Sequence, residues 1–266
     1  MQEIAQQVYI ENSYAGVTLG AINWPHGLVL IDAPIRPEDA RSWRSALLNL
    51  GGGVDRMQVT LDSHLDRTLG SRAMDCTVVG HEKLVQVFRN RPVTFKTQTS
   101  ETGSEYELHN GLGSIRWAPP EITFTDSLQI NWNDSPLCLE YRPGTTSDAI
   151  WAVLPKERVV FVGDAVTVNQ PPFLGFADLP QWIAALRTLQ EPRFRDFLIV
   201  SGRGGLVANE QLHLQINFLE QTLEKLENLA AKSKPAESAE ELALSLCDII
   251  SGIRKPQHIQ RLQWGL

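Results

Sequence analysis

The segment VTLDSHLDRTLG, residues 59–70, decides the fold of this chain. The apolar run that leads into it, residues 57–61, predicts a short buried strand. The polar residues that follow put Asp62, His64 and Asp66 at alternate positions, and an extended chain sends alternate side chains to one face. Two carboxylates and an imidazole on one face can bind a divalent cation. In the alternative interpretation, the two aspartates cap the loop and His64 makes one structural hydrogen bond.

The composition bounds the class of protein. The chain has 266 residues, of which 42% are hydrophobic and 21% charged, as expected for a globular protein with one sizeable core. Its formal net charge of -7 argues against a nucleic-acid partner. Three widely spaced cysteines predict reduced thiols. The start of the chain does not follow the signal-peptide pattern, and apolar runs fall short of the ~20 residues of a membrane span. We therefore expect a cytoplasmic protein without a membrane partner.

Apolar β-branched runs alternate with helical patterns along the chain. We expect one domain over residues 1–231, followed by a linker and a helix, residues 232–266, that pack on the same domain. Residues 91–120 are polar and irregular, and we expect them to cover one rim of a site or, alternatively, to form a plain surface loop. Residues 122–124 and 128–132 are expected to be strands of a meander. A leucine seam in the helix that begins near Asn209 is expected to pack on a sheet, or alternatively against a second subunit in a homodimer.

Several landmarks occur in an order that resembles the metallo-β-lactamase superfamily. Residues 62–67, DSHLDR, stand where that family carries His-x-His-x-Asp-His. Residues 143–146, PGTT, match its Pro-Gly-His-Thr loop, and residues 161–165, FVGDA, match its Gly-Asp strand end. Residues 201–204, SGRG, match its last Gly-His-Gly loop. The resemblance spans about residues 8–229. It implies an α+β fold, the αββα four-layer sandwich, with metal ligands on loops along one edge of two facing sheets.

The family's metal-binding positions are partly retained. Among them the sequence keeps His64, Asp66 and Asp164, while Asp62 replaces a histidine and can still bind an ion through oxygen. Thr145 replaces another histidine, and a neutral hydroxyl is a poor zinc ligand. The resemblance therefore implies at most one divalent ion, Zn, Mn or Fe, held weakly by Asp62, His64 and Asp164. A metal-free form is an equal alternative.

Two arginines stand at the second metal position of the family. Arg67 and Arg203 replace ligands there, and a guanidinium group has no lone pair with which to bind a metal. Asp66 and Asp164 face the same position and would repel each other without a nearby cation. We expect the two guanidinium groups, whose forked donors match carboxylates, to substitute for the second metal. The alternative is two unrelated arginines exposed in loops.

Two functions stay open at this point. The first is a metal-dependent hydrolase that acts on an ester, lactone or thioester. In it Asp66 orients the attacking water, Arg67 or Arg203 binds a substrate carboxylate or stabilises an oxyanion, and Thr145 contacts the substrate. The second is a catalytically inactive member that binds a small anion in the arginine-lined cleft, or a protein partner. Fold alone does not decide between them.

Overall fold

A computed structural model describes residues 1–96, 102–110, 112–231, 236–250 and 255–266. In this structure the strand predicted over residues 57–61 forms at Asp55–Val59 (β5). It pairs in parallel with β4 (Gly27–Ile31) on one side and with β6 (Thr77–His81) on the other. Its last residue, Val59, is fully buried. The polar segment that follows β5 therefore starts inside the molecule, at the carboxyl edge of a parallel sheet.

Two sheets face each other. The first has the strand order β1 (Gln2–Ala5), β2 (Val8–Glu11), β3 (Leu19–Asn23), β4, β5, β6 and β9 (Ile122–Phe124). The second has the order β10 (Ser127–Ile130), β11 (Leu137–Tyr141), β12 (Ile150–Leu154), β13 (Val159–Thr167), β14 (Leu198–Arg203) and β15 (Gly205–Val207). The prediction that residues 122–124 and 128–132 belong to one meander was wrong, because β9 joins the first sheet and β10 joins the second.

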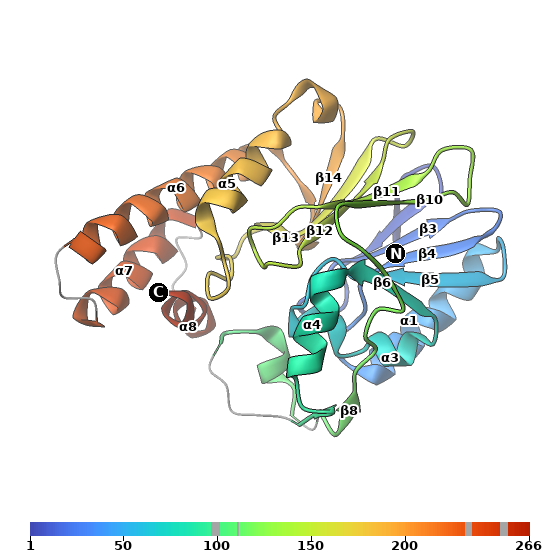
Figure 1. Cartoon of the computed structure of the whole chain (residues 1–266), viewed down its shortest axis with the longest axis horizontal. Helices are drawn as coiled ribbons and strands as arrows, with labels where there is room; N and C mark the ends of the chain where they lie inside the picture. Colours follow the sequence, from blue (N-terminus) through green and yellow to red (C-terminus); the bar gives the residue numbers. More distant parts are fainter. Residues whose placement is uncertain (97–101, 111, 232–235, 251–254) are drawn as a thin grey trace.

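Helices cover the outer faces of both sheets, so that the layers run αββα as predicted (Figure 1). The helices of the described residues are α1 (Pro37–Leu47), α2 (Leu65–Thr68), α3 (Ser71–Met74), α4 (Glu82–Asn90), α5 (Leu179–Thr188), α6 (Asn209–Ala231), α7 (Ala236–Ile250) and α8 (Pro256–Gly265). Short 3₁₀ turns lie at Leu48–Leu50, Glu105–Leu108 and Pro192–Phe194, and a small hairpin joins Thr94–Phe95 (β7) to Ile115–Arg116 (β8).

Strand β12 shows why the layers are arranged in this way. Its residues alternate between two cores, because successive side chains of a strand point to opposite faces. Ile150 and Leu154 pack between the two sheets, whereas Trp151 and Val153 pack under the helices that cover the second sheet. Every residue of β12 is apolar and buried, as expected for a strand covered on both faces.

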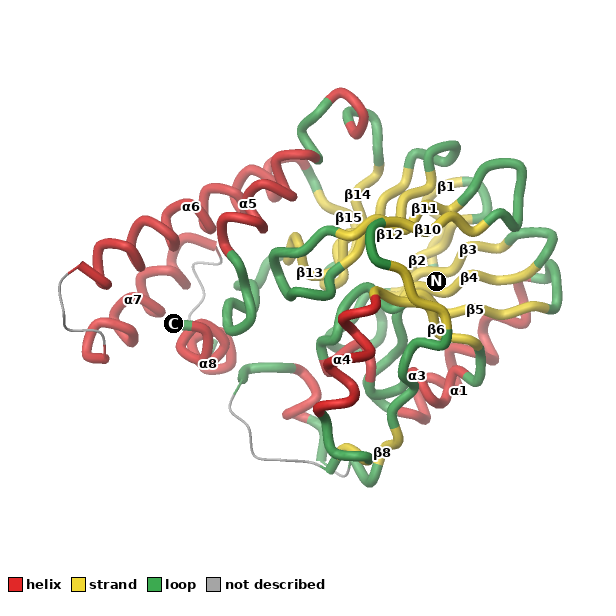
Figure 2. The backbone as a smooth tube through the Cα atoms, viewed as in Figure 1, coloured by secondary structure: helices red, strands yellow, loops and turns green. Residues whose placement is uncertain are grey.

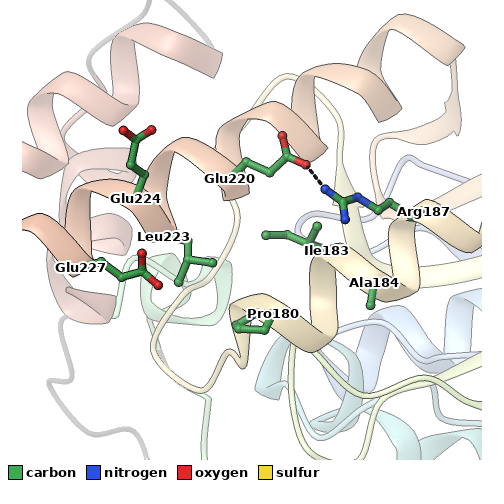
Figure 3. A pocket seen from close by; sticks show the side chains of 8 residues that line it. All are labelled: Pro180, Ile183, Ala184, Arg187, Glu220, Leu223, Glu224 and Glu227. Atoms are coloured by element: carbon green, nitrogen blue, oxygen red, sulfur yellow. Dashed lines mark hydrogen bonds and ion pairs between the residues drawn. The ribbon is translucent and has the colours of Figure 1, made fainter.

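The long helix α6 packs its leucine seam within the chain. Leu212, Ile216 and Leu219 are buried in the same cluster as residues of α5 and β13. Beside this contact, α5 and α6 enclose a shallow hollow of about 360 Å³ (Figure 3). Arg187 and Glu220 form an ion pair across it at 2.7 Å. Among the described residues, no helix is long and apolar enough to cross a membrane.

The irregular chain between α4 and β9 reaches α8 (Figure 2). Arg261 of α8 is fully buried and donates hydrogen bonds to Gly103 O at 2.9 and 3.1 Å. The same guanidinium group lies 4.0 Å from the ring centroid of Phe173. Part of the segment expected to be irregular, residues 97–101 and 111, lies outside the described residues. Arg261 thus joins the C-terminal helix to the described part of the rim.

Candidate functional site

The segment after β5 is helical rather than extended. Helix α2 begins at Leu65, so the alternation expected for Asp62, His64 and Asp66 does not occur. His64 caps the helix, its Nδ1 accepting a hydrogen bond from Asp66 N at 3.2 Å. Asp62 Oδ1 accepts a hydrogen bond from His64 N at 2.8 Å. Asp62 thus caps the loop as the alternative interpretation has it, but Asp66 does not, because its side chain is fully buried in the interior.

Arg67 follows on α2 and is 1% exposed. Its Nη1 donates to Asp32 Oδ2 at 2.6 Å, and its Nη2 donates to Asp164 Oδ1. Its Nε lies 2.8 Å from Asp62 Oδ1, an ion pair without hydrogen-bond alignment. A Cβ atom at residue 202 would stand 2.9 Å from Nη1, so Gly202 leaves the space that this guanidinium group fills. One cation therefore contacts three carboxylates.

Arg203 ends β14 and approaches from the second sheet. Its Nε lies 3.0 and 3.1 Å from the two carboxylate oxygens of Asp164. Its Nη1 donates to Asp66 Oδ2 at 2.7 Å and to Gly16 O at 2.8 Å, and its Nη2 lies 3.0 Å from His64 Nδ1. We call Asp32, Asp62, Asp66, Arg67, Asp164 and Arg203 the arginine–carboxylate cluster. The predicted pairing of the two arginines with Asp66 and Asp164 is confirmed, and the exposed-arginine alternative is wrong.

Backbone donors complete the cluster. Asp66 accepts hydrogen bonds from Tyr106 N at 2.8 Å and from Glu105 N at 3.1 Å. Asp32 adopts a left-handed conformation, with φ of 59°, and its Oδ1 accepts from Leu61 N at 2.9 Å. Asn and Asp tolerate this conformation better than most residues. The first sheet, the second sheet and the rim segment are thus joined through buried carboxylates.

The four carboxylates of the cluster outnumber its two guanidinium groups, and their pKa values separate accordingly. Burial raises the pKa of Asp62 to about 7 against the opposing effect of Arg67. Burial also raises the pKa of Asp32. For Asp66 and Asp164, burial is outweighed by the nearby guanidinium groups, Arg203 foremost, which hold both pKa values below the usual range. Within the cluster, burial therefore favours the protonated form of Asp62 and of Asp32, whereas Asp66 and Asp164 stay ionised.

His64 has the neighbours of a Ser-His-Asp triad but the opposite hydrogen-bond directions. Its Nε2 lies 3.5 Å from Ser104 Oγ and its Nδ1 lies 3.8 Å from Asp66 Oδ2. However, Nδ1 faces two donors, Asp66 N and Arg203 Nη2, so we assign the ring proton to Nε2. Burial and Arg203 lower the pKa of His64 to about 3. A neutral imidazole with its proton on Nε2 cannot accept the proton of Ser104.

The cluster does not fit a metal ion. Among the described residues, no group of three or more His, Cys, Asp or Glu is arranged to hold one. Zinc lies about 2.0–2.2 Å from ligating oxygen and nitrogen atoms, and Arg67 contacts both Asp62 and Asp164 where such an ion would bind. The lone pair of His64 Nδ1 faces Arg203 Nη2. The three residues predicted to bind the metal are therefore close together, with their binding atoms turned to arginine.

A cavity of about 490 Å³ adjoins the cluster. Asp62, His64 and Asp164 lie on its wall, as does Thr145 from the loop between β11 and β12. Arg67 and Arg203 do not line it, so the arginine-lined cleft expected from the sequence is absent from the described cavity wall. The rim predicted for residues 91–120 contributes Arg91, Phe95, Thr102, Ser104 and Tyr106.

Several residues of this region were not predicted from the sequence. Asp32 could have been suspected, because it directly follows a buried strand. Asp148 ends the PGTT loop, lines the cavity and is 1% exposed, and burial raises its pKa. Phe173 and Trp264 also line the cavity and carry no sequence signal, since each reaches it through tertiary packing.

No family model and no curated protein matches the chain. Solved structures do match. A metallo-β-lactamase from Pontibacter korlensis has a TM-score of 0.63 and 20% identity, over 82% of this chain and 97% of its own. A metallo-β-lactamase family protein from Thermus thermophilus has a TM-score of 0.68 and 18% identity, over 98% and 92%. This chain has the metallo-β-lactamase fold. A stereoselective inverting sec-alkylsulfatase from Pseudomonas sp. shares it, with a TM-score of 0.67 and 14% identity over 98% of this chain and 49% of its own.

Proposed function

We propose that this protein binds a small organic molecule without a metal ion, in the cavity beside the arginine–carboxylate cluster. The observation that carries this proposal is the Arg67 guanidinium group, which contacts Asp32, Asp62 and Asp164 at once. It supplies the positive charge that these carboxylates need, and it occupies the position between Asp62 and Asp164 where a dication would bind both. The cavity of about 490 Å³ has the size of a small-molecule site. The proposal follows the inactive-member alternative.

A small anion fits this cavity less well than the sequence suggested. Asp62 and Asp148 lie on its wall, whereas the two arginines that were to attract the anion are turned into the cluster. Burial raises the pKa of both aspartates, and an approaching anion would oppose their ionisation further. Cytoplasmic location and a homodimer stay predictions from the sequence.

Metal analysis of protein purified without chelator tests the proposal. We expect less than about a tenth of an equivalent of any transition metal, and no rise of the melting temperature when zinc is added. The matched variant carries Thr145→His, Arg67→His and Arg203→His, which restores nitrogen ligands in place of guanidinium groups. We expect zinc to raise the melting temperature of this variant. One equivalent of bound metal in the unmodified protein would refute metal-independent binding.

A second candidate is hydrolysis of an ester, lactone or thioester without a metal. One observation favours it: Asp62 lines the cavity, and its pKa of about 7 is suited to a general base. In that case Asp62 would take a proton from water, and Asp62→Asn would abolish turnover of an activated aryl ester. If Asp62→Asn hydrolyses the ester as fast as the unmodified protein, this candidate fails and small-molecule binding stands.

A further inference from the structure

The cavity wall holds a donor and an acceptor that the described chain leaves unpaired. Arg91 Nη1 and Asp148 Oδ2 are both buried, and no described residue makes a hydrogen bond with either atom. Both residues line the cavity. Buried polar groups are nearly always paired in folded proteins, because an unpaired group has lost water without a replacement. These two atoms are therefore suited to a partner that comes from outside the chain.

Ser63 holds the two groups side by side. Its carbonyl oxygen accepts a hydrogen bond from Arg91 Nη2 at 2.6 Å, and its hydroxyl group donates to Asp148 Oδ1 at 3.0 Å. The Arg91 guanidinium group is fixed from behind by the rings of Trp117 and Phe88, with centroids 4.7 and 5.0 Å away. Arg91 thus uses Nη2 for Ser63 and Asp148 uses Oδ1, while Arg91 Nη1 and Asp148 Oδ2 have no hydrogen bond to the described residues.

The charge around the two atoms selects against ions of either sign. An anion placed at Arg91 would also meet the carboxylates of Asp62 and Asp148 on the same wall. A cation placed at Asp148 would meet the guanidinium group of Arg91. A neutral group that accepts at one end and donates at the other satisfies both residues. A carboxamide is such a group, and it loses less hydration than a zwitterion on entering an apolar cavity.

The rest of the wall is suited to an apolar body. Aromatic rings from four separate segments line it, namely Phe95, Tyr106, Phe173, Phe176 and Trp264. The rings of Phe176 and Trp264 meet edge to face at 5.0 Å, with Phe176 largely exposed and Trp264 partly exposed. Aromatic faces favour flat apolar or aromatic groups.

We propose that the cavity binds a carboxamide attached to an aromatic or other flat apolar body. The amide oxygen accepts a hydrogen bond from Arg91 Nη1, the amide N–H donates to Asp148 Oδ2, and the body packs against the aromatic wall. This inference rests on the proposed function, because it requires a cavity without a metal ion. It names the chemical class of the ligand.

Titration of the full chain with three probes, followed by NMR, tests the assignment. Benzamide carries both polar functions, benzoate lacks the donor, and benzylamine lacks the acceptor. We expect benzamide to bind at least about ten-fold more tightly than either of the other probes, because each of them leaves one buried group unpaired. Equal or tighter binding of benzoate or benzylamine would overturn the carboxamide assignment and leave metal-independent binding in place. One equivalent of bound metal would overturn both.

Two substitutions test whether Arg91 and Asp148 contact the carboxamide. Asp148→Asn retains the shape of the side chain but can turn an N–H toward the amide donor, and Arg91→Met retains the apolar stem beside Trp117 while removing the guanidinium group. We expect each to weaken benzamide binding at least about ten-fold. Arg89→Met, at an exposed position in α4 two residues before Arg91, is the matched control and should bind benzamide unchanged. Unaltered dispersion of the NMR spectrum checks folding. Folded Asp148→Asn and Arg91→Met variants that bind benzamide like the unmodified protein would refute the contact.

Discussion

The arginine–carboxylate cluster and the wall of the cavity lie next to each other and differ in how their charged groups are paired. In the cluster, Arg203 makes contacts with Asp164, Asp66, Gly16 and His64, so each of its three nitrogen atoms has a partner. On the wall, Arg91 keeps Nη1 unpaired among the described residues. Asp62 and Ser63, adjacent in sequence, belong one to each region. Arg67 Nε also lacks an aligned hydrogen bond to a described residue, but it lies 2.8 Å from Asp62 Oδ1. The difference indicates that the charges of the cluster are paired within the described chain and that Arg91 Nη1 on the wall is not.

The largest expected effect comes from removing the central cation of the cluster. Arg67→Met leaves Asp32, Asp62 and Asp164 buried without it. Removal of one partner from a buried ion pair costs about 3–5 kcal/mol, and we expect at least that loss in the free energy of unfolding measured with urea. Arg67→Lys retains the charge but cannot contact three carboxylates. Its free energy of unfolding should therefore lie between those of the unmodified protein and of Arg67→Met.

Arg36→Met is the control for this prediction. Arg36 pairs with Asp39 at 2.6 Å on α1, and its side chain is 41% exposed. An exposed pair contributes about 0–1 kcal/mol. If Arg67→Met lowers the free energy of unfolding no more than Arg36→Met does, the cluster does not stabilise the fold. The contrast between cluster and wall then disappears.

A smaller effect is expected from the proton on Asp62. A carboxyl group whose pKa is raised on folding favours the folded state at low pH, and this contribution is lost as the pH rises from about 4 to about 7. Asp66 and Asp164 have lowered pKa values, so their contribution is complete above about pH 4 and is lost as the pH falls below it. Asp62 by itself therefore makes the free energy of unfolding decline between about pH 4 and 7, whereas His64, whose pKa is lowered to about 3, opposes that decline up to about pH 6.5.

Asp62→Asn should remove the contribution of Asp62 to that decline, which is on the order of a few kcal/mol, and should leave the contributions of Asp32 and Asp148, whose pKa values burial also raises. Urea denaturation at several pH values measures it. Asp75→Asn is the control, since the Asp75 side chain is 77% exposed and pairs with Arg44 at the surface. A decline that persists unchanged in Asp62→Asn would assign it to other groups and would contradict the partition of pKa values within the cluster.

The smallest effect on stability is expected at the mouth of the cavity. Phe176 is 74% exposed, so Phe176→Ala should change the free energy of unfolding by no more than about 0.5 kcal/mol. The same substitution removes one ring of the aromatic wall and should weaken benzamide binding a few-fold. A large loss of stability here would mean that the mouth is part of the core, and the distinction between the two regions would be less sharp.

The fold could be predicted from the sequence because the loops at the ends of its strands occur in a recognisable order. The pairing of Arg67 and Arg203 with aspartates could be predicted in the same way, since both arginines stand in those loops. Helix α8 was missed, because Gln257, Gln260 and Gln263 interrupt its apolar pattern. The alternation of Asp62, His64 and Asp66 was wrong, because a period of two was assumed for a segment that turns into a helix.

The unpaired atoms of Arg91 and Asp148 on the cavity wall could not be predicted from the sequence. Ser63 and Asp148 are 85 residues apart, and Arg91 comes from the end of α4. Arg91 opens the predicted rim and Asp148 follows the PGTT loop, but nothing in the sequence indicates that the two side chains meet, because their shared contact with Ser63 depends on how the two sheets face each other. Long-range contacts of this kind are set by packing, which a single sequence does not display.

The guanidinium group of Arg67 is a counter-ion attached to the chain by covalent bonds. Such a counter-ion has no dissociation constant, so dilution, chelators or a shortage of trace elements in the cell leave it in place. The charge balance of this site is fixed when the chain folds, and a single codon change is enough to remove it.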